Sequence, residues 1–182
     1  MIFSKTEFAG LYLIEPKVFK DSRGYFLEVW NHKKFVEAGL ELSFVQVNHS
    51  RSVKNTLRGL HYQVENVQGK LVRVSYGEIF DVSVDLRRSQ PTFGKCFCVR
   101  LSSEDQRMIW IPPGFAHGFM VLSEYAEFQY NCSDYYNPTA ERCIIWNDPK
   151  LRIDWPIDNE KILILSEKDQ KGSLFSEAEV FP

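Results

Sequence analysis

The sequence lacks the features that mark several large classes of protein. No apolar stretch approaches the roughly 18 residues that cross a membrane, and the first residues lack the charged-then-apolar pattern of a secretion signal. The 22 lysines and arginines do not exceed the 24 acidic residues, so neither a nucleic-acid surface nor an anionic-membrane surface is indicated. We therefore expect a cytoplasmic protein that binds neither nucleic acid nor membrane.

Paired cysteines are lacking as well. The four cysteines, Cys96, Cys98, Cys132 and Cys143, form no Cys-x-x-Cys pair, so a zinc site of that kind is not indicated. In a reducing compartment we expect them to be free, small, buried hydrophobic residues. Cys96 and Cys98 have the spacing of residues that share one face of a strand.

What is present is typical of one globular domain. The chain has 182 residues, of which 44% are hydrophobic and 14% aromatic, and this is enough to bury a sizeable core. It carries a formal net charge of −2. No repeat, linker or low-complexity tract divides it, so we expect a single domain over residues 1–182.

Short segments rich in β-branched and aromatic residues predict an all-β barrel or sandwich with few helices. The expected strands are Leu11–Glu15, Tyr25–Trp30, Phe44–His49, Leu57–Gln63, Leu71–Tyr76, Ile79–Leu86, Cys96–Leu101, Arg107–Ile111, Gly118–Leu122 and Glu127–Tyr135. Gly77-Glu78, between two apolar runs, predicts a tight hairpin turn. One helix is expected between Asn31, as its N-cap, and Gly39, and a short helical turn near Ser166–Gln170.

Three residues with distinct chemistry stand in two neighbouring strands. Arg58 and His61 lie in the segment Leu57–Gln63, and Lys70 follows shortly after. A histidine exchanges protons near neutral pH, a lysine stabilises an oxyanion, and an arginine binds phosphate. The combination suggests proton abstraction beside a carbonyl on a phosphorylated substrate. A histidine that is only a hydrogen-bonded core residue and a lysine that only snorkels to solvent are the alternatives.

Strand alternation indicates where these side chains point. Lys70 shares a face with Val72 and Val74, and Tyr130 shares the more apolar face of its strand with Phe128. The tyrosine hydroxyl therefore needs a polar partner. Asp81 lies on the face of its strand opposite a wholly apolar set, and that face is either solvent or the lining of a polar cavity.

The segment 111–118 resembles the second motif of the cupins, Pro-x-Gly-x-x-His, which Pro112, Gly114 and His117 match. The resemblance implies a double-stranded β-helix, or jelly roll. Many cupins bind a metal through an earlier His-x-His motif followed by Glu. Here Gln63 stands at the second histidine position after His61, and no Glu follows at the usual spacing. Two imidazoles without a carboxylate partner make a poor divalent-metal site, so we expect no metal.

Many further segments, in order, resemble the dTDP-4-dehydrorhamnose 3,5-epimerases. The resemblance runs from about residue 15 to residue 169 and covers most of the chain. The matching segments are Asp21–Phe26, Leu57–Gln63, Gln68–Val72, Phe80–Arg87, Pro91–Gly94, Pro112–Phe119 and Trp146–Pro149. The resemblance implies that dTDP-4-keto-6-deoxyglucose is epimerised at C3 and C5 to dTDP-4-keto-L-rhamnose. The reaction proceeds by proton abstraction α to the C4 ketone, and no cofactor is needed.

The resemblance also implies a role for each matching residue. His61 is the general base, oriented by Asp169, while Tyr130 is the general acid on the opposite face of the sugar. Lys70 lies beside the C4 oxygen. Tyr136 stacks on the thymine, and Phe19 assists on the same side. Other positions that match nucleotide-sugar-binding residues are Arg23, Glu28, Gln46, Asn48, Arg58, His117, Glu141 and Lys168.

One position departs from the family pattern. The family often has Val-Gln-Asp-Asn where this chain has Val-Gln-Val-Asn, so Val47 replaces an aspartate. If that side chain faces outward, nothing changes. If it touches the nucleotide, the preferred donor sugar could differ.

Three other functions remain open from the sequence. An epimerase of C3 alone or C5 alone would use the same base and acid. A non-catalytic sugar-binding jelly roll and a metal-dependent cupin oxygenase are the others.

The resemblance further implies a homodimer whose sheets extend across the interface, with the amino-terminal strands, up to about Glu15, as candidates for that exchange.

Overall fold

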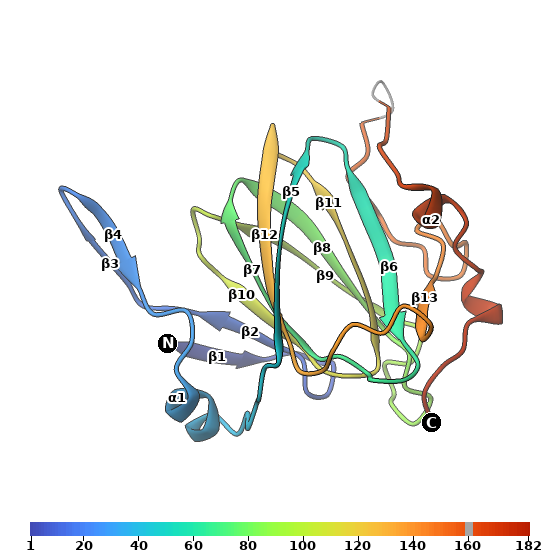
Figure 1. Cartoon of the computed structure of the whole chain (residues 1–182), viewed down its shortest axis with the longest axis horizontal. Helices are drawn as coiled ribbons and strands as arrows, with labels where there is room; N and C mark the ends of the chain where they lie inside the picture. The colour runs from blue at the N-terminus through green and yellow to red at the C-terminus, as the bar shows by residue number, and fades with distance from the viewer. Residues whose placement is uncertain (159–161) are drawn as a thin grey trace.

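The computed structural model of the chain describes residues 1–158 and 162–182, and strands dominate it (Figure 1). The strands are β1 (Ile2–Lys5), β2 (Tyr12–Glu15), β3 (Val18–Asp21), β4 (Gly24–Leu27), β5 (Gln46–Val53), β6 (Leu57–Gln63), β7 (Lys70–Tyr76), β8 (Glu78–Asp85), β9 (Cys96–Ser102), β10 (Met108–Ile111), β11 (Phe115–Val121), β12 (Tyr125–Cys132) and β13 (Glu141–Cys143). The helices are α1 (His32–Glu37), α2 (Glu167–Gln170) and the 3-10 turn η1 (Phe175–Glu177). None of the described helices is long and apolar enough to cross a membrane.

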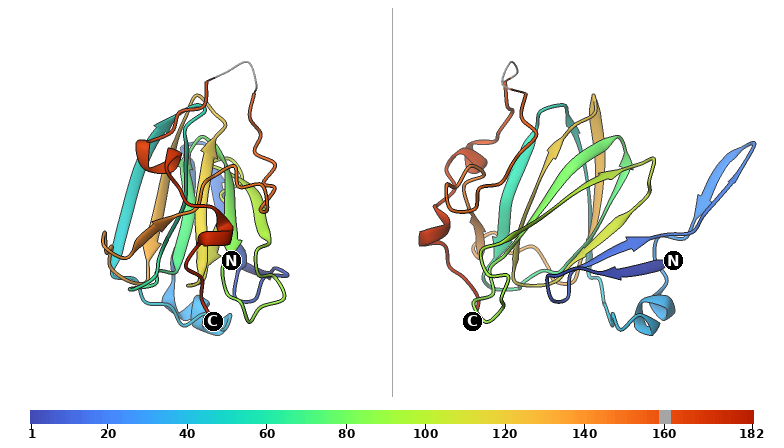
Figure 2. Two further views of the ribbon diagram at one scale, coloured as in Figure 1. Left: turned by 90° about the vertical axis from the view of Figure 1, so that its right-hand side faces the viewer. Right: turned by 180° about the vertical axis from the view of Figure 1, so that it is seen from behind.

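Two antiparallel sheets face each other and form the jelly roll that the sequence predicts. The first has six strands in the order β1-β2-β10-β7-β12-β5, and the second has five in the order β13-β6-β11-β8-β9. The strands β3 and β4 form a separate hairpin that projects away from both sheets (Figures 1 and 2). The two sheets enclose the interior, so side chains that alternate inward from facing strands meet there.

The space between the sheets is filled mainly by apolar side chains. Val72, Ile109 and Phe128 from the first sheet pack with Ile79 and Phe119 from the second. The remainder of this layer holds polar groups, because β8 turns its odd-numbered residues inward. The aspartates and the serine on that face, Asp81, Ser83 and Asp85, are all fully buried. Burial excludes solvent as the surroundings of Asp81, but Asp81 does not line any of the cavities described below, so it lies in a polar part of the packed interior.

Each outer face is partly covered by a segment outside the sheets. The carboxy-terminal segment runs beside β6 and β13 (Figure 2) and places Trp155 against Val82 and Val84 of β8. On the first sheet, Phe35 of α1 packs with Trp110 of β10. The covering by α1 explains why β10, Met-Ile-Trp-Ile, is apolar on both of its faces.

Both predicted helices are present with the predicted caps. The side chain of Asn31 accepts a hydrogen bond from the backbone of Lys34, so it caps α1. Ser166 caps α2, where it forms a capping box with Asp169. The box fixes Asp169 at the third helical position, and this becomes important at the site described below.

Several predictions about the fold are wrong or incomplete. Gly77 does not make a hairpin, because β7 belongs to the first sheet and β8 to the second, so the chain crosses between sheets there. Gly77 has φ of +78°, and a Cβ at this position would lie 2.3 Å from the carbonyl oxygen of Tyr125. The strands β1, β3 and β13 and the turn η1 are not among the expected elements. All four cysteines are free as expected, but only Cys132 is buried, and Cys98 is exposed.

Candidate active site

A cavity of about 300 Å³ opens between the two sheets, and three of the four predicted catalytic residues line it: His61, Lys70 and Tyr130. His61 comes from β6 in the second sheet, whereas Lys70 and Tyr130 come from β7 and β12 in the first. In the register of the first sheet Lys70 pairs with Cys132, two residues from Tyr130. The imidazole and the phenol therefore approach the cavity from opposite sheets.

A bulge in β6 brings Arg58 to the same side as His61. Strand alternation alone would put residues three apart on opposite faces. In the pairing of β6 with β11, His117 lies opposite His61 and Phe119 opposite Arg58, so three steps on β6 match two on β11. Both side chains then border an adjoining cavity of about 140 Å³. The bulge needs a glycine, because Gly59 has φ of +125° and a Cβ there would lie 2.5 Å from the Cα of Gly118.

The remaining predicted catalytic residue, Asp169, stands behind the imidazole. Its Oδ1 lies 2.8 Å from Nε2 of His61, and the same oxygen accepts a hydrogen bond from the backbone of Gly59 at 3.0 Å. Its Oδ2 accepts from the hydroxyl of Ser166 at 2.6 Å. Burial alone would raise the pKa of Asp169, but the contacts with His61, Ser166 and Gly59 outweigh it and lower the pKa to about 2. Asp169 is therefore a fixed anion next to the imidazole.

The contact with Asp169 defines which nitrogen of His61 is free. Nε2 is buried against the carboxylate, and the contact is short but poorly aligned for a hydrogen bond. The imidazole side chain is 28% exposed, so Nδ1 is the nitrogen left for a substrate. An anion at Nε2 favours the tautomer with its proton there and the lone pair on Nδ1.

The protein environment also shifts the pKa values of the two residues facing His61. Burial lowers the pKa of Lys70, an effect that the charges of Cys132, Glu141 and Asp81 oppose. Burial and the proximity of Cys132 raise the pKa of Tyr130, against the opposing effects of Arg58 and Asn48. The phenol therefore stays protonated near neutral pH and is a proton donor.

Most predicted binding residues surround the same cavity. Tyr136 donates a hydrogen bond through its hydroxyl to Glu141 at 2.7 Å, and Glu141 also forms an ion pair with Lys168. Burial would raise the pKa of Glu141, but the contacts with Lys168 and Tyr136 outweigh burial and lower it. Gln46 joins the group, since its side chain donates to Asn48 and accepts from the backbone of Tyr136. Two neighbouring cavities, both lined in part by His61 and Arg58, lie beside the main one. The predicted residues that line at least one of the three cavities are His61, Lys70, Tyr130, Asp169, Gln46, Asn48, Arg58, His117, Tyr136 and Glu141.

Three predicted binding residues lie elsewhere. Arg23 and Phe19 are on the projecting hairpin, where the side chain of Arg23 is 88% exposed and pairs with Asp21 at 2.7 Å. Glu28 forms an ion pair with Lys34 at 2.7 Å beside α1. The structure therefore does not bring them to the cavity within one chain.

Val47 faces away from the cavity. Gln46 and Asn48, its neighbours on β5, line the cavity, whereas Val47 is 67% exposed on the opposite face. Of the two alternatives for the missing aspartate, the outward-facing one is correct, so the substitution leaves this chain's own cavity unchanged.

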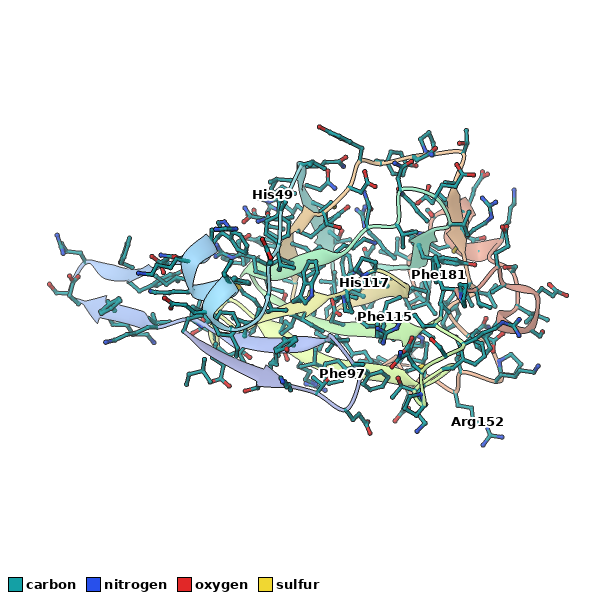
Figure 3. All side chains as sticks on the ribbon, turned by 90° about the horizontal axis from the view of Figure 1, so that it is seen from below. His49, Phe97, Phe115, His117, Arg152 and Phe181 are labelled. Atoms are coloured by element: carbon teal, nitrogen blue, oxygen red, sulfur yellow. The ribbon has the colours of Figure 1, made fainter. Side chains whose placement is uncertain are left out.

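Sequence reasoning missed one buried pair at the site. Nε2 of His117 lies 2.8 Å from Oδ2 of Asp81, and both residues are buried. In Figure 3 His117 lies in the interior of the molecule, whereas Arg152 points outward. The contact of His61 with Asp169 agrees with what the family resemblance implies, whereas the expectation of an imidazole without a carboxylate partner is wrong for His117, which has Asp81.

Period-two spacing would have found further lining residues. Gln63 stands two residues after His61, Gln68 two before Lys70, and Ser50 two after Asn48. Gln63 and Gln68 line the main cavity, and Ser50 lines the adjoining one. The signal was present in the strand alternation of residues already singled out.

A jelly roll with a histidine–aspartate pair, a lysine and a tyrosine around a polar cavity defines a cupin-fold sugar epimerase, and comparisons with known proteins specify the family. The model of the dTDP-4-dehydrorhamnose 3,5-epimerase family matches residues 5–177. The chain belongs to this family.

Three relatives illustrate the similarity. The dTDP-4-dehydrorhamnose 3,5-epimerase of Pseudomonas aeruginosa is 58% identical over 93% of each chain. A solved 3,5-epimerase from Legionella pneumophila in complex with dTDP-4-keto-L-rhamnose is 48% identical, with a TM-score of 0.93 over 98% of this chain and 94% of that one. A 3'-monoepimerase from Streptomyces bikiniensis in complex with dTDP-quinovose is 31% identical, with a TM-score of 0.85 over 92% and 84%.

Proposed function

We propose that this isomerase inverts C3 and C5 of dTDP-4-keto-6-deoxyglucose and releases dTDP-4-keto-L-rhamnose, without a cofactor. The observation that carries the proposal is the meeting of His61, Lys70 and Tyr130 in one cavity from two facing sheets. Inversion needs a base and an acid on opposite faces of the sugar ring, and this arrangement supplies both.

The chemistry follows from the ketone at C4. Hydrogens on C3 and C5 are both α to it, so removal of either gives an enolate with its charge on the C4 oxygen. Nδ1 of His61 takes the proton, and the anion of Asp169 stabilises the imidazolium that forms. The ammonium of Lys70 stabilises the enolate oxygen in a cavity of low dielectric. Tyr130 then returns a proton to the other face of the carbon.

Charge placement around the cavity suits a nucleotide diphosphate. Arg58 borders the adjoining cavity, where its Nε donates to the hydroxyl of Ser52 at 3.1 Å and leaves the other guanidinium nitrogens for phosphate. Lys168 stands at the rim with Glu141. Tyr136 is 51% exposed at the same rim, as a ring that stacks on a base must be.

We further propose that the chain acts as a cytoplasmic homodimer in which the projecting hairpin supplies Arg23 and Phe19 to the partner's cavity. Aromatic side chains on this hairpin are unusually exposed, since Phe19 is 52% and Phe26 69% accessible. The edge strand β1 offers unpaired backbone groups to a second sheet. An exposed hairpin that bears substrate-binding residue types, remote from its own cavity, fits delivery to another chain.

A coupled assay tests the reaction. The purified protein is incubated with dTDP-4-keto-6-deoxyglucose, a rhamnose-forming reductase and NADPH, and NADPH consumption is expected. Proton NMR in D2O then distinguishes the alternatives, because a 3,5-epimerase incorporates deuterium at both carbons and a monoepimerase incorporates it at one. No NADPH consumption and no deuterium at either carbon would refute the function.

Mixing two inactive variants tests the dimer. His61→Asn lacks the base and Arg23→Ala lacks the hairpin arginine, so in a mixed dimer one cavity combines the intact copy of each residue. Free subunit exchange should restore activity in about a quarter of the sites. The double variant His61→Asn/Arg23→Ala mixed with His61→Asn is the control, and it should stay inactive. Full activity of Arg23→Ala alone, or a monomer in light scattering, would contradict the proposal.

A further inference from the structure

Three different metal-ligating groups converge behind the imidazole of the catalytic histidine. A ring nitrogen of His61, Sγ of Cys143 and a carboxylate oxygen of Asp169 all lie within 4.8 Å of one another, and Nε2 is the nitrogen of His61 that lies 2.8 Å from Asp169. Among residues 1–158 and 162–182 no other three such side chains meet in this way. They come from three elements, β6, β13 and α2, and the register of β13 places Cys143 directly opposite His61.

We propose that this cluster is an inhibitory Zn²⁺ site, in which the ion occupies Nε2 of His61 together with the thiolate of Cys143 and the carboxylate of Asp169. Binding rests only on these three side chains, whereas inhibition also rests on the proposed role of His61 as the base. Catalysis itself needs no metal in this proposal.

The donor set selects the ion. Nitrogen, sulfur and oxygen together suit Zn²⁺, which binds four ligands in a tetrahedron, while Mg²⁺ and Ca²⁺ prefer oxygen alone. Zinc–ligand bonds are about 2.0 to 2.3 Å, so the outermost ligand atoms must approach one another by roughly 1 Å. Cys143 is on the short edge strand β13, and Ser173 donates to its carbonyl on the outer side, so the approach is made by rotation of the side chains and not by a shift of the strand. Water from a separate cavity, which both His61 and Asp169 line, takes the fourth position.

The surroundings of the imidazole favour an incoming cation. Nε2 of His61 is buried and has no aligned hydrogen-bond partner, although Asp169 is close. The thiol of Cys143 must lose its proton to bind the ion. Zn²⁺ displaces that proton, and the thiolate and carboxylate together then balance its two charges.

Occupation of Nε2 would stop the reaction for a specific reason. A neutral imidazole carries one proton, and a metal at Nε2 forces that proton onto Nδ1. The nitrogen that faces the substrate then has no lone pair and cannot act as a base. The ion would also take Asp169 away from the imidazolium that it is placed to stabilise.

Direct binding tests the site without relying on turnover. Chelator-treated protein is titrated with Zn²⁺ by calorimetry, and one ion per chain is expected. Co²⁺ is then added as a spectroscopic probe, and a near-ultraviolet sulfur-to-cobalt charge-transfer band is expected. Cys143→Ser should abolish that band and weaken Zn²⁺ binding at least about tenfold. Cys98→Ser, which changes an exposed cysteine on β9, is the matched control and should behave as wild type.

Turnover measurements test the inhibition. In the coupled assay saturating Zn²⁺ should reduce the rate more than tenfold, a chelator should restore it, and Mg²⁺ should have no effect. Cys143→Ser should keep near wild-type turnover without zinc and resist inhibition by zinc. Unchanged Zn²⁺ affinity in Cys143→Ser, or no charge-transfer band in the wild type, would refute the site. Tight binding at Cys143 with undiminished turnover would refute the inhibition, and an enzyme inactive even without zinc would refute the proposed function while leaving the binding result intact.

Discussion

Replacing Tyr130 with phenylalanine should separate two events that normally occur together, proton exchange and inversion. The variant removes one oxygen and keeps the ring, whose centroid lies 5.5 Å from that of Phe128 beside the main core. His61, on the other sheet, can still remove a proton and return it to the same face of the sugar. Deuterium should therefore enter C3 or C5 with retention, while inversion stalls.

The expected size of the effect follows from the position of the hydroxyl. A positioned general acid contributes about 10²- to 10⁴-fold to a rate, or roughly 3 to 5 kcal/mol of barrier. Tyr130 is partly buried, so water is a poor substitute for its hydroxyl at the same place. Because the ring and its packing survive, the free energy of unfolding should change by no more than about 1 kcal/mol.

The assay is proton NMR of the substrate in D2O, followed for wild type and Tyr130→Phe at equal concentration. Loss of the C3 and C5 proton signals reports exchange, and growth of the product signals reports inversion. The expected variant exchanges protons measurably and inverts at least about 100-fold more slowly than wild type. If Tyr130→Phe inverts both carbons at near wild-type rates, Tyr130 is only a core tyrosine and the acid lies elsewhere.

Three other predictions concern the base, metal and a buried ion pair. His61→Asn should abolish turnover in the coupled assay yet still bind dTDP in calorimetry, and substantial activity would exclude His61 as the base. Exhaustive chelator treatment should leave activity at or above its starting level, and a loss reversed by one divalent ion would overturn metal-free catalysis. Asp85→Asn should lower the free energy of unfolding by roughly 3 kcal/mol at pH 7, because buried Asp85 accepts from Arg87 at 2.7 Å and Thr92 at 2.6 Å. Burial would raise the pKa of Asp85, but Arg87 and Thr92 lower it below 3.8, so its stabilisation is full above pH 4 and is lost as pH falls through the folded value. Urea unfolding should show a smaller difference in the free energy of unfolding between wild type and Asp85→Asn at pH 3 than at pH 7. An equal difference at both pH values would indicate lost packing and not lost charge.

Strand alternation predicted the orientation of most site residues correctly. It placed Lys70 on the face of Val72, and Tyr130 on that of Phe128, and both valine and phenylalanine are buried between the sheets. The caps at Asn31 and Ser166 were also predicted correctly, because an N-cap acts on backbone groups only two or three residues away. Local rules succeeded wherever the relevant partner was close in sequence.

The same rules failed where the partner was distant. Gly77 has the chemistry of a hairpin turn, but which strands pair depends on the whole jelly roll, and its two strands belong to different sheets. A bulge in the pairing with β11 brings Arg58 to the same face of β6 as His61, although their spacing predicts opposite faces. A bulge depends on both paired strands, so the sequence of β6 alone does not reveal it. Asp81 could be placed on a face by alternation, but its partner His117 is 36 residues away.

Arg23, Phe19 and Glu28 show a further limit. Resemblance to relatives indicates that such residues touch the nucleotide-sugar, but it carries no information on which copy of the chain holds that sugar. Within one chain Arg23 is at the tip of a hairpin that projects away from the cavity, with its guanidinium mostly in water. A charged residue gains little there, because an ion pair with Asp21 that lies in water is screened by the solvent. Placed in another chain's cavity, the same guanidinium would meet a diphosphate. Mixing Arg23→Ala with His61→Asn therefore tests whether Arg23 acts in the cavity of the other chain.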